Sequence, residues 1–333
     1  MTMKRILLMT AFLVEAVFLL KYGCVIKQRL YECFVSQPQN NYTSCGCDSA
    51  SIQKALEEYS ALTDEEDAWY TKYRVISHAG GEIEGHIYTN SLEAWNHSYS
   101  RGDRVFDADL IFTSDSVLVV RHDWWENLEQ TSERMNQHNT RIDVKGMQRF
   151  KHVENMPLAY KEFKDNKIFG RYTPMSASDM LLYMHNHQDL YIAADAKDDV
   201  LRVYKELICL AQELNIVDVL DRIIVNIYEY EMYDSIMRAY KFPHTTIRQS
   251  GARKKPYEEI LAFCVEKNIH VINITPNFME PAWIDVFVKK GIHPYFAVVD
   301  YMSDMKYYEQ MGFWGCVSNL LHEDMFKSAS DPK

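Results

Sequence analysis

From Tyr73 onward, short runs rich in β-branched and aromatic residues alternate with amphipathic helical runs. The run Val117–Asp123 is interpreted as the returning arm of a hairpin that extends the strand before it. With that arm set aside, about eight strand-plus-helix units remain, which predicts a parallel sheet and favours a closed (β/α)8 TIM barrel over an open doubly wound sheet. The strand-like runs are RVISH, RVFDADLIF, LYIAADAK, RIIVNIY, HTTIRQS, HVINITPN, PYFAVVDY and WGCVSNLL.

The predicted barrel occupies residues 71–325, and two segments do not follow its alternation. Residues 124–175 are too long for a simple βα loop and too charged for a core, so they are predicted to be an insertion over one end of the barrel. Residues 31–70 begin polar and turn-rich and continue with a helical pattern. We expect a stalk and a lead-in helix there.

The first 30 residues have the composition of a membrane anchor. A basic start precedes an apolar run from Ile6 to Leu20, and its continuation to Ile26 gives roughly the 20 residues that a bilayer core requires. Glu15 would cost about 2.5–3.5 kcal/mol at the centre of such a helix, which the many large apolar residues can offset. We expect residues 1–30 to be an uncleaved single-pass anchor, with the barrel on the extracytoplasmic side. A cleaved signal peptide is the alternative, although no small-x-small cleavage site follows the run.

Composition excludes several classes of protein. The 333 residues are 47% hydrophobic and carry a formal net charge of −11. This composition argues against disorder, and the charge argues against a protein that holds nucleic acid by bulk attraction. An anionic substrate would therefore need basic side chains at its site. The seven cysteines have mixed spacings that match neither a disulfide framework nor a zinc motif.

Acidic side chains recur at the ends of two predicted strands. Asp107 and Asp109 are two residues apart on a strand, so both point to the same face. Asp195 and Lys197 repeat this arrangement on the next predicted strand. Adjacent carboxylates repel one another unless a cation or a shared proton intervenes. Three hard oxygen ligands favour Mg²⁺ or Ca²⁺, although each aspartate alone could equally cap a helix or pair with a surface lysine.

Two histidines occupy similar positions at strand ends. His78 ends the first predicted strand, before a segment with three glycines, and His122 ends the hairpin arm. A lone histidine of this kind is usually structural, but two beside a carboxylate cluster suit the general acid and base that hydrolysis of a stable ester requires. Asn90 is expected to be the N-cap of the helix that follows, with Glu93 as its partner at the third helical position.

The motifs HAGG, TNSLEAW, FDADLIFTSDSVLVVRHDW and IAADAK together resemble the glycerophosphodiester phosphodiesterase family, barrel enzymes related to phosphatidylinositol-specific phospholipase C. The family pattern has a histidine-arginine-glycine strand end, an asparagine-led helix, an acid-x-acid strand, a hairpin ending in His-Asp and an acid-x-lysine strand. The resemblance covers roughly residues 74–320 and is most specific over 75–123. The family also has a small insertion after the hairpin.

The resemblance implies a role for each matching residue. His78 and His122 would be the acid-base pair, and Lys197 would face the phosphate. The divalent cation would be bound by Asp107, Asp109 and Asp195.

Four positions depart from the family pattern. Ala79 replaces the arginine that contacts phosphate, and Thr89 replaces an acid before the helix asparagine. Asp107 and Asp195 replace glutamates and are one methylene shorter. These departures leave the expected fold unchanged and put the rate and the substrate in question.

The leading hypothesis is metal-assisted hydrolysis of a glycerophosphodiester or related polyol phosphodiester, a small-molecule or lipid-derived substrate. A second hypothesis, which Ala79 motivates, is a membrane-tethered, catalytically weak barrel that binds glycerophosphate polymers or lipid headgroups. A third is a glycoside hydrolase, whose carboxyl pair Asp107 and Asp195 could provide, but this would leave both histidines unexplained.

Overall fold

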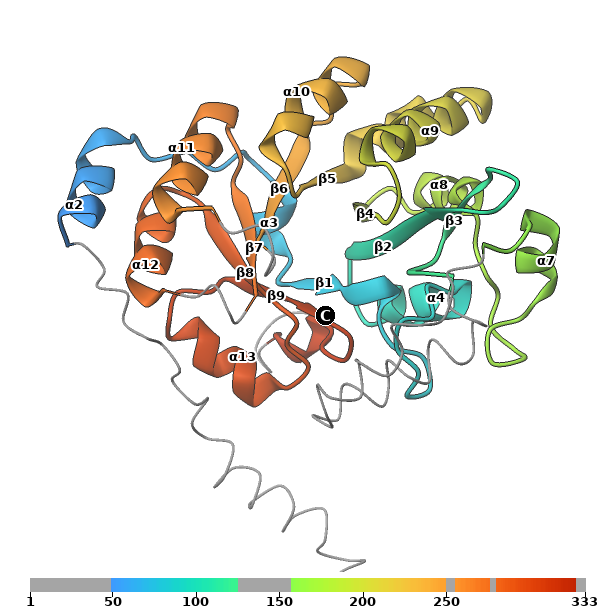
Figure 1. Ribbon diagram of the computed structural model, residues 1–333. Helices are drawn as coiled ribbons and strands as arrows, with labels where there is room; N and C mark the ends of the chain where they lie inside the picture. Colours follow the sequence, from blue (N-terminus) through green and yellow to red (C-terminus); the bar gives the residue numbers. More distant parts are fainter. Residues whose placement is uncertain (1–48, 125–156, 250–254, 276–279, 328–333) are drawn as a thin grey trace, which may run out of the picture. The chain divides into compact units, whose positions relative to one another are not determined.

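The computed structural model describes residues 49–124, 157–249, 255–275 and 280–327 (Figure 1). The predicted anchor at residues 1–30 lies outside these ranges, as do parts of the predicted stalk and insertion. Among the helices of the described ranges, none has the length and apolar character needed to cross a membrane.

Eight parallel strands form a closed barrel, which confirms the predicted fold. The strands follow one another around the sheet, and β1 closes it by pairing with both β9 and β2. The predicted hairpin is also present, because β3 runs antiparallel to β2, with Leu110 opposite Val120. The strands are β1 Val75–Ser77, β2 Val105–Phe112, β3 Leu118–Val120, β4 Tyr191–Ala196, β5 Ile223–Ile227, β6 His244–Gln249, β7 Val271–Ile274, β8 His293–Ala297 and β9 Gly315–Ser318.

Helices surround the barrel and connect its strands (Figure 1). One connecting helix, α8, was not anticipated from the sequence; Ser176 and Asp179 form a capping box at its start, a signal that the sequence does contain. The α-helices are α2 Ser49–Glu58, α3 Trp69–Lys72, α4 Leu92–Ser100, α7 Tyr160–Asp165, α8 Ala177–Asn186, α9 Val200–Glu213, α10 Tyr230–Ala239, α11 Tyr257–Lys267, α12 Pro281–Lys289 and α13 Met302–Glu309. Short 3₁₀ helices are η1 His78–Gly80, η3 Val217–Arg222 and η5 Glu323–Met325.

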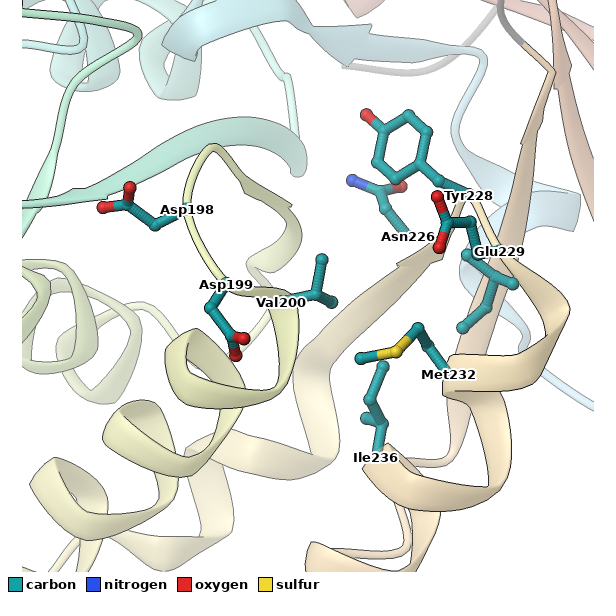
Figure 2. A pocket seen from close by; sticks show the side chains of 9 residues that line it. Asp198, Asp199, Val200, Asn226, Tyr228, Glu229, Met232 and Ile236 are labelled. Atoms are coloured by element: carbon teal, nitrogen blue, oxygen red, sulfur yellow. The ribbon is translucent and has the colours of Figure 1, made fainter. Parts of the chain in front are cut away.

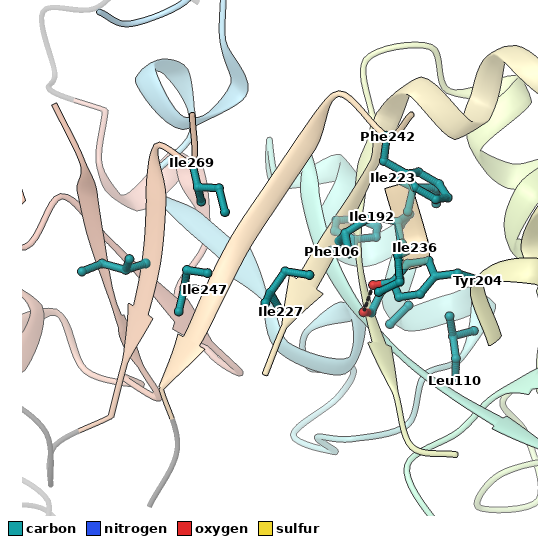
Figure 3. Packing of buried hydrophobic residues seen from close by; sticks show 14 of the residues in the cluster. Phe106, Leu110, Ile192, Tyr204, Ile223, Ile227, Ile236, Phe242, Ile247 and Ile269 are labelled. Atoms are coloured by element: carbon teal, nitrogen blue, oxygen red, sulfur yellow. Dashed lines mark hydrogen bonds between the residues drawn. The ribbon is translucent and has the colours of Figure 1, made fainter. Parts of the chain in front are cut away.

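The strands alternate between two environments. On β2, the side chains of Phe106 and Leu110 join the large hydrophobic cluster between the barrel and its helices (Figure 3). Tyr204 of α9 belongs to the same cluster, and its hydroxyl donates to the Ala194 carbonyl of β4 at 3.1 Å. Since alternate residues of a strand face opposite sides, Asp107 and Asp109 point into the barrel.

The barrel interior changes from apolar to polar along the strands. A second hydrophobic cluster contains the inward residues near the strand starts, and α3 packs Trp69 and Tyr70 against them. The inward positions further along β2 and β4 are Asp107, Asp109 and Asp195. The packed layer therefore closes one end and leaves polar side chains at the other, the carboxyl ends where barrel enzymes hold their sites. The strand residues of the apolar layer are Ile76, Val105, Ala193, Ile224, Val271, Tyr295 and Val317.

The segment before the barrel packs against it at α12. The ammonium of Lys290, buried just after α12, donates to the Leu56 carbonyl at 2.8 Å and to the Tyr59 carbonyl. The Leu62 amide donates back to the Lys290 carbonyl at 2.8 Å. Residues 56–62 are therefore fixed to the turn between α12 and β8.

Replacing Leu110 by alanine tests the outward packing of β2. Leu110 is fully buried, so we expect Leu110→Ala to lower the free energy of unfolding by about 2–5 kcal/mol, measured by urea denaturation. Leu182→Ala on α8 is the matched control; that side chain is 41% exposed, and its loss should change stability by less than about 0.5 kcal/mol. Equal stability of the two variants would contradict the assigned strand orientation.

Candidate active site

Side chains from four strands and their following loops meet at the carboxyl end of the barrel. Asp107 and Asp109 come from β2 and Asp195 from β4, with β2 and β4 paired so that Asp109 lies opposite Asp195. Sequence reasoning placed these three and Lys197 together, and the structure shows them in contact. It adds two side chains that were missed, Arg248 of β6 and Tyr228 after β5.

Arg248 bridges two of the carboxylates. Its guanidinium lies 3.0 Å from Asp107 Oδ2 and 2.9 Å from Asp195 Oδ2. The arginine side chain is only 12% exposed, so these ion pairs are screened little by water. The flanking carboxylates raise the pKa of Arg248 further above its usual value, against the opposing effect of burial. The guanidinium is therefore a permanent positive charge inside the barrel mouth.

Lys197 bridges a second pair of carboxylates. Its Nζ lies 2.9 Å from both Asp109 Oδ1 and Asp195 Oδ2. Tyr228 donates its hydroxyl to Asp195 Oδ1 at 2.8 Å, and Asn90 donates Nδ2 to Asp109 Oδ2 at 2.9 Å. Every carboxylate oxygen of the three aspartates thus has a cationic or hydrogen-bonding neighbour.

The three carboxyl groups differ in their affinity for protons. Burial is the largest effect at each and raises its pKa. At Asp109 the combined effect of Lys197, the two histidines and the Asn90 hydrogen bond exceeds burial, and at Asp195 Lys197 and Arg248 together exceed it, so both pKa values are lowered. At Asp107 burial prevails over Arg248, and the pKa is raised. Asp109 and Asp195 are therefore the permanent negative charges of the cluster.

The aspartates form a charge cluster with the chain's own cations. Their oxygens face Lys197 and Arg248, so a divalent cation would fit between them only if these basic side chains moved. Within the described ranges, the His, Cys, Asp and Glu ligand atoms that converge within 4.8 Å belong to another group, formed by Glu82, His97 and His322. As the side chains lie here, the aspartates do not fit a metal ion, and Mg²⁺ or Ca²⁺ at that position stays a prediction.

His78 lies in η1, directly after β1, and is buried. Its Nδ1 is 3.0 Å from Asn319 Oδ1. The Asn319 amide is oriented by Asp300, which accepts from its Nδ2 at 3.1 Å and from its backbone N–H at 2.8 Å. Because Asn319 offers its oxygen, we assign the proton of neutral His78 to Nδ1, which leaves Nε2 as the basic nitrogen.

His122 follows β3 and is partly exposed, with 31% of its side chain accessible. Its Nδ1 lies 2.9 Å from Asp123 Oδ2, so Nδ1 carries a proton and Nε2 is the nitrogen that titrates. The ring of Tyr88 packs edge-on against both histidines, with its centroid 4.6 Å from that of His78 and 5.8 Å from that of His122. The two histidines therefore lie near each other at the barrel mouth.

The histidine pKa values move in opposite directions. Burial lowers the pKa of His78, against the opposing effect of Asp107 and Asp109. Burial also disfavours protonated His122, but Asp109 and Asp123 outweigh it and raise the pKa. At a pH near 6.5, neutral His78 can accept a proton while protonated His122 can donate one.

Asn90 is not the helix cap that the sequence suggested. Ser91 is the N-cap of α4, where its hydroxyl accepts from the Ala94 amide at 3.2 Å, and Glu93 bonds Thr173. Asn90 instead has a positive φ of 49°, which aims its amide at Asp109. The adjacent Ser91 competes for the capping role, a signal that is visible in the sequence.

A pocket of about 220 Å³ lies beside this cluster, between the start of α9 and α10 (Figure 2). Asn226 and Tyr228 of the β5 end line it, together with Asp199 and Glu229. Tyr228 borders both the pocket and the charge cluster, since its hydroxyl bonds Asp195. The rest of the lining includes the apolar side chains of Ile227, Met232 and Ile236, so Tyr228 is the lining residue that connects the pocket with the cluster.

Replacing Arg248 by methionine tests the charge cluster. The substitution leaves Asp107 and Asp195 without their shared cation, so we expect a loss of about 3–5 kcal/mol in stability at pH 7, measured by urea denaturation. Arg238→Met is the matched control, because this exposed arginine of α10 bonds Asp234 and Ser235 of its own helix and, in the described part of the chain, no carboxylate of the cluster. Arg248→Lys should lose less than Arg248→Met because it keeps the charge. An Arg248→Met protein as stable as Arg238→Met would show that Arg248 does not neutralise these carboxylates.

Comparison with known proteins identifies the family to which this chain belongs. The model of the "Glycerophosphoryl diester phosphodiesterase family" matches residues 79–317, more than two thirds of the chain. No curated protein matches. Among solved structures, a putative glycerophosphodiester phosphodiesterase from Galdieria sulphuraria has a TM-score of 0.58 at 13% identity, with 76% of this chain and 96% of that chain covered.

Two further solved structures resemble the fold. A putative glycerophosphoryl diester phosphodiesterase from Silicibacter pomeroyi DSS-3 has a TM-score of 0.54 at 14% identity, covering 81% of this chain and 94% of its own. A phosphodiesterase from Oleispira antarctica, in complex with the product sn-glycerol-3-phosphate, has a TM-score of 0.55 at 13% identity, covering 76% and 96%. The structures support the barrel, and the family match shows that this chain belongs to the glycerophosphoryl diester phosphodiesterase family, a family of phosphoric diester hydrolases.

Proposed function

We propose that this protein hydrolyses a glycerophosphodiester, with His78 and His122 as the acid-base pair. The observation that carries the proposal is the pair of histidines that both contact Tyr88, each with Nδ1 held by a partner, beside a buried charge cluster. Family membership supports the reaction class. The product bound to the Oleispira antarctica enzyme supports a small phosphodiester as the substrate.

The opposite pKa shifts suggest a role for each histidine. His78 Nε2 would take the proton from the attacking water or substrate hydroxyl, because burial keeps this imidazole neutral. His122 Nε2 would donate a proton to the departing alkoxide, because Asp109 and Asp123 favour its protonated form. Asn319 and Asp123 would hold the two rings in the required tautomers. Each proton transfer typically contributes about 10² to 10⁴-fold to the rate.

The phosphate would be bound by the positive groups that reach the mouth. Lys197 has 20% of its side chain exposed, so its ammonium can contact an anionic oxygen while Asp109 and Asp195 hold it in place. Arg248 lies deeper and would add positive charge behind it. Together these two cations would do part of the work of the arginine that Ala79 replaces.

A divalent cation at the three aspartates is a separate part of the proposal. A divalent cation bound by Asp107, Asp109 and Asp195 would neutralise a non-bridging phosphate oxygen. Donor chemistry favours Mg²⁺ or Ca²⁺ for these oxygens. Because Lys197 and Arg248 already pair with them, we assign no step to the ion.

The pocket beside Tyr228 would take the alcohol part of the substrate. The acidic Asp199 and Glu229 line it, and Tyr228 joins it to the cluster. Carboxylates can accept hydrogen bonds from polyol hydroxyl groups, and a phenol can donate one to them.

We also propose that residues 1–30 hold the protein at a membrane, with the barrel on the extracytoplasmic side. This proposal rests on the apolar sequence of that segment alone.

The test is diesterase activity of the purified protein on glycerophosphodiesters and on an aryl phosphodiester, with Mg²⁺, Ca²⁺ or chelator. We expect turnover that His122→Ala reduces by about 10² to 10⁴-fold, because the leaving alkoxide loses its acid. His185→Ala, an exposed histidine of α8, is the control and should retain full activity. Dependence on added metal that Asp109→Asn abolishes would support the aspartate metal site. If the protein binds these diesters but turns over none of them under any condition, the hydrolase proposal is wrong and a binding function is supported.

The pH dependence of kcat/KM should be bell-shaped. His78 is active as a base only above its lowered pKa, so activity falls on the acidic side of about 6.5. His122 is active as an acid only below its raised pKa, so activity falls on the basic side. Asp123→Asn removes one of the charges that raise the pKa of His122, and it should move the basic limb toward lower pH and leave the acidic limb in place. A basic limb unchanged in that variant would contradict the assignment of His122.

A further inference from the structure

A second cluster of ligand-type side chains lies outside the charge cluster, where three segments of the chain meet. Glu82 follows η1 in the loop that begins with His78, His97 is in the last turn of α4, and His322 lies between β9 and η5. One ligand atom from each lies within 4.8 Å of the other two. The rings of His97 and His322 are 5.5 Å apart and nearly perpendicular.

The two imidazoles direct buried nitrogens into this space with no hydrogen-bond partner. His97 Nε2 and His322 Nε2 are both inaccessible to water and unpaired. His322 is 1% exposed as a whole residue. Glu82 Oε1 is 3.8 Å from His97 Nε2, too far for a hydrogen bond. Leaving a buried polar atom without a partner is unfavourable, so the arrangement favours a ligand that satisfies several such atoms at once.

The other side of His322 has the arrangement of a metal-binding histidine. Its Nδ1 lies 2.7 Å from Oδ2 of Asp103, which is fully buried. Asp103 also accepts from the Ser77 hydroxyl at 2.7 Å and from the Glu323 amide at 2.7 Å. A carboxylate behind the imidazole fixes the proton on Nδ1 and turns a basic Nε2 toward the shared space, as in carboxylate–histidine–zinc triads.

We infer that Glu82, His97 and His322 bind a divalent transition-metal ion of the zinc class. Two imidazole nitrogens and one carboxylate oxygen form a donor set that favours Zn²⁺. Mg²⁺ and Ca²⁺ instead take oxygen ligands. Two ligand atoms about 2 Å from one tetrahedral ion are roughly 3.3 Å apart, so the 3.8 Å between Glu82 Oε1 and His97 Nε2 needs only a small adjustment. Water would complete the fourth position.

The ion would fasten the loop that carries His78. It would link Glu82 of this loop to α4 and to the segment after β9. Through His322 and Asp103 the same linkage reaches Ser77, the residue directly before His78. The ion would thereby link the backbone on both sides of His78. Zinc binding by Glu82, His97 and His322 does not depend on the proposed hydrolase activity, because it is inferred from the positions of these three side chains.

The test compares zinc binding by the purified full-length protein and by variants, after removal of metal by chelator. We expect the wild type to take up stoichiometric zinc, measured by titration and elemental analysis, and zinc to raise its thermal midpoint. Glu82→Gln and His97→Ala, both at partly exposed positions, should lose this uptake and the stabilisation. Asp103→Asn should weaken zinc binding about 10- to 100-fold, because the carboxylate that holds Nδ1 of His322 is lost.

Two controls separate this site from other ligands in the chain. Asp109→Asn, in the charge cluster, and His185→Ala, on α8, should both bind zinc like the wild type. Equal uptake by Glu82→Gln, His97→Ala and wild type would overturn the inference, as would loss of zinc in Asp109→Asn or a wild type that binds none. Each of these results is independent of whether the protein hydrolyses a phosphodiester.

Discussion

Closure of the barrel depends on a strand of three residues. β1 is the only partner that joins β9 to β2 in the described ranges, and its register with β2 consists of the Ser77–Phe106 pair. So short a strand provides few backbone hydrogen bonds, and side chains supply additional contacts. Glu323 accepts from the Val75 amide at 2.6 Å, and Asp103 accepts from the Ser77 hydroxyl. The residue that follows is His78, so the contacts that close the sheet also set the position of a candidate catalytic group.

The same closure explains why three carboxylates can be buried at the mouth. Inward positions of β2, β4 and β6 face a common axis, so Arg248 reaches Asp107 and Asp195 although it is far from both in sequence. Isolated charges could not remain in so dry a site, because desolvation would neutralise or expose them. Lys197 completes the compensation at Asp109. The ion pairs hold these charged side chains in fixed positions. A reaction that develops charge on a phosphate benefits from charges that are already in place.

Features of the fold that depend on local sequence patterns could be predicted from the sequence. The alternation of strand-like and helical runs predicted the number of strands and the hairpin, and a period of two predicted that Asp107 and Asp109 share a face. The structure contains all of these features. Contacts between strands distant in sequence could not be read in this way. Arg248 was missed because its strand, HTTIRQS, gives no hint of which carboxylates lie across the barrel. His322 was missed because its partners Glu82 and His97 are joined to it only by the folded chain.

The attachment of residues 56–62 at Lys290 has a mechanical consequence. These contacts lie just before the start of β8, at the end of the barrel opposite to the candidate active site. A pulling force that reaches the domain through its N-terminal segment would act first on α2 and the turn after α12. The side chains of Asp107, Asp195 and Arg248 lie at the other end of the barrel from that attachment. A domain held from that side could bear tension while its mouth keeps its geometry.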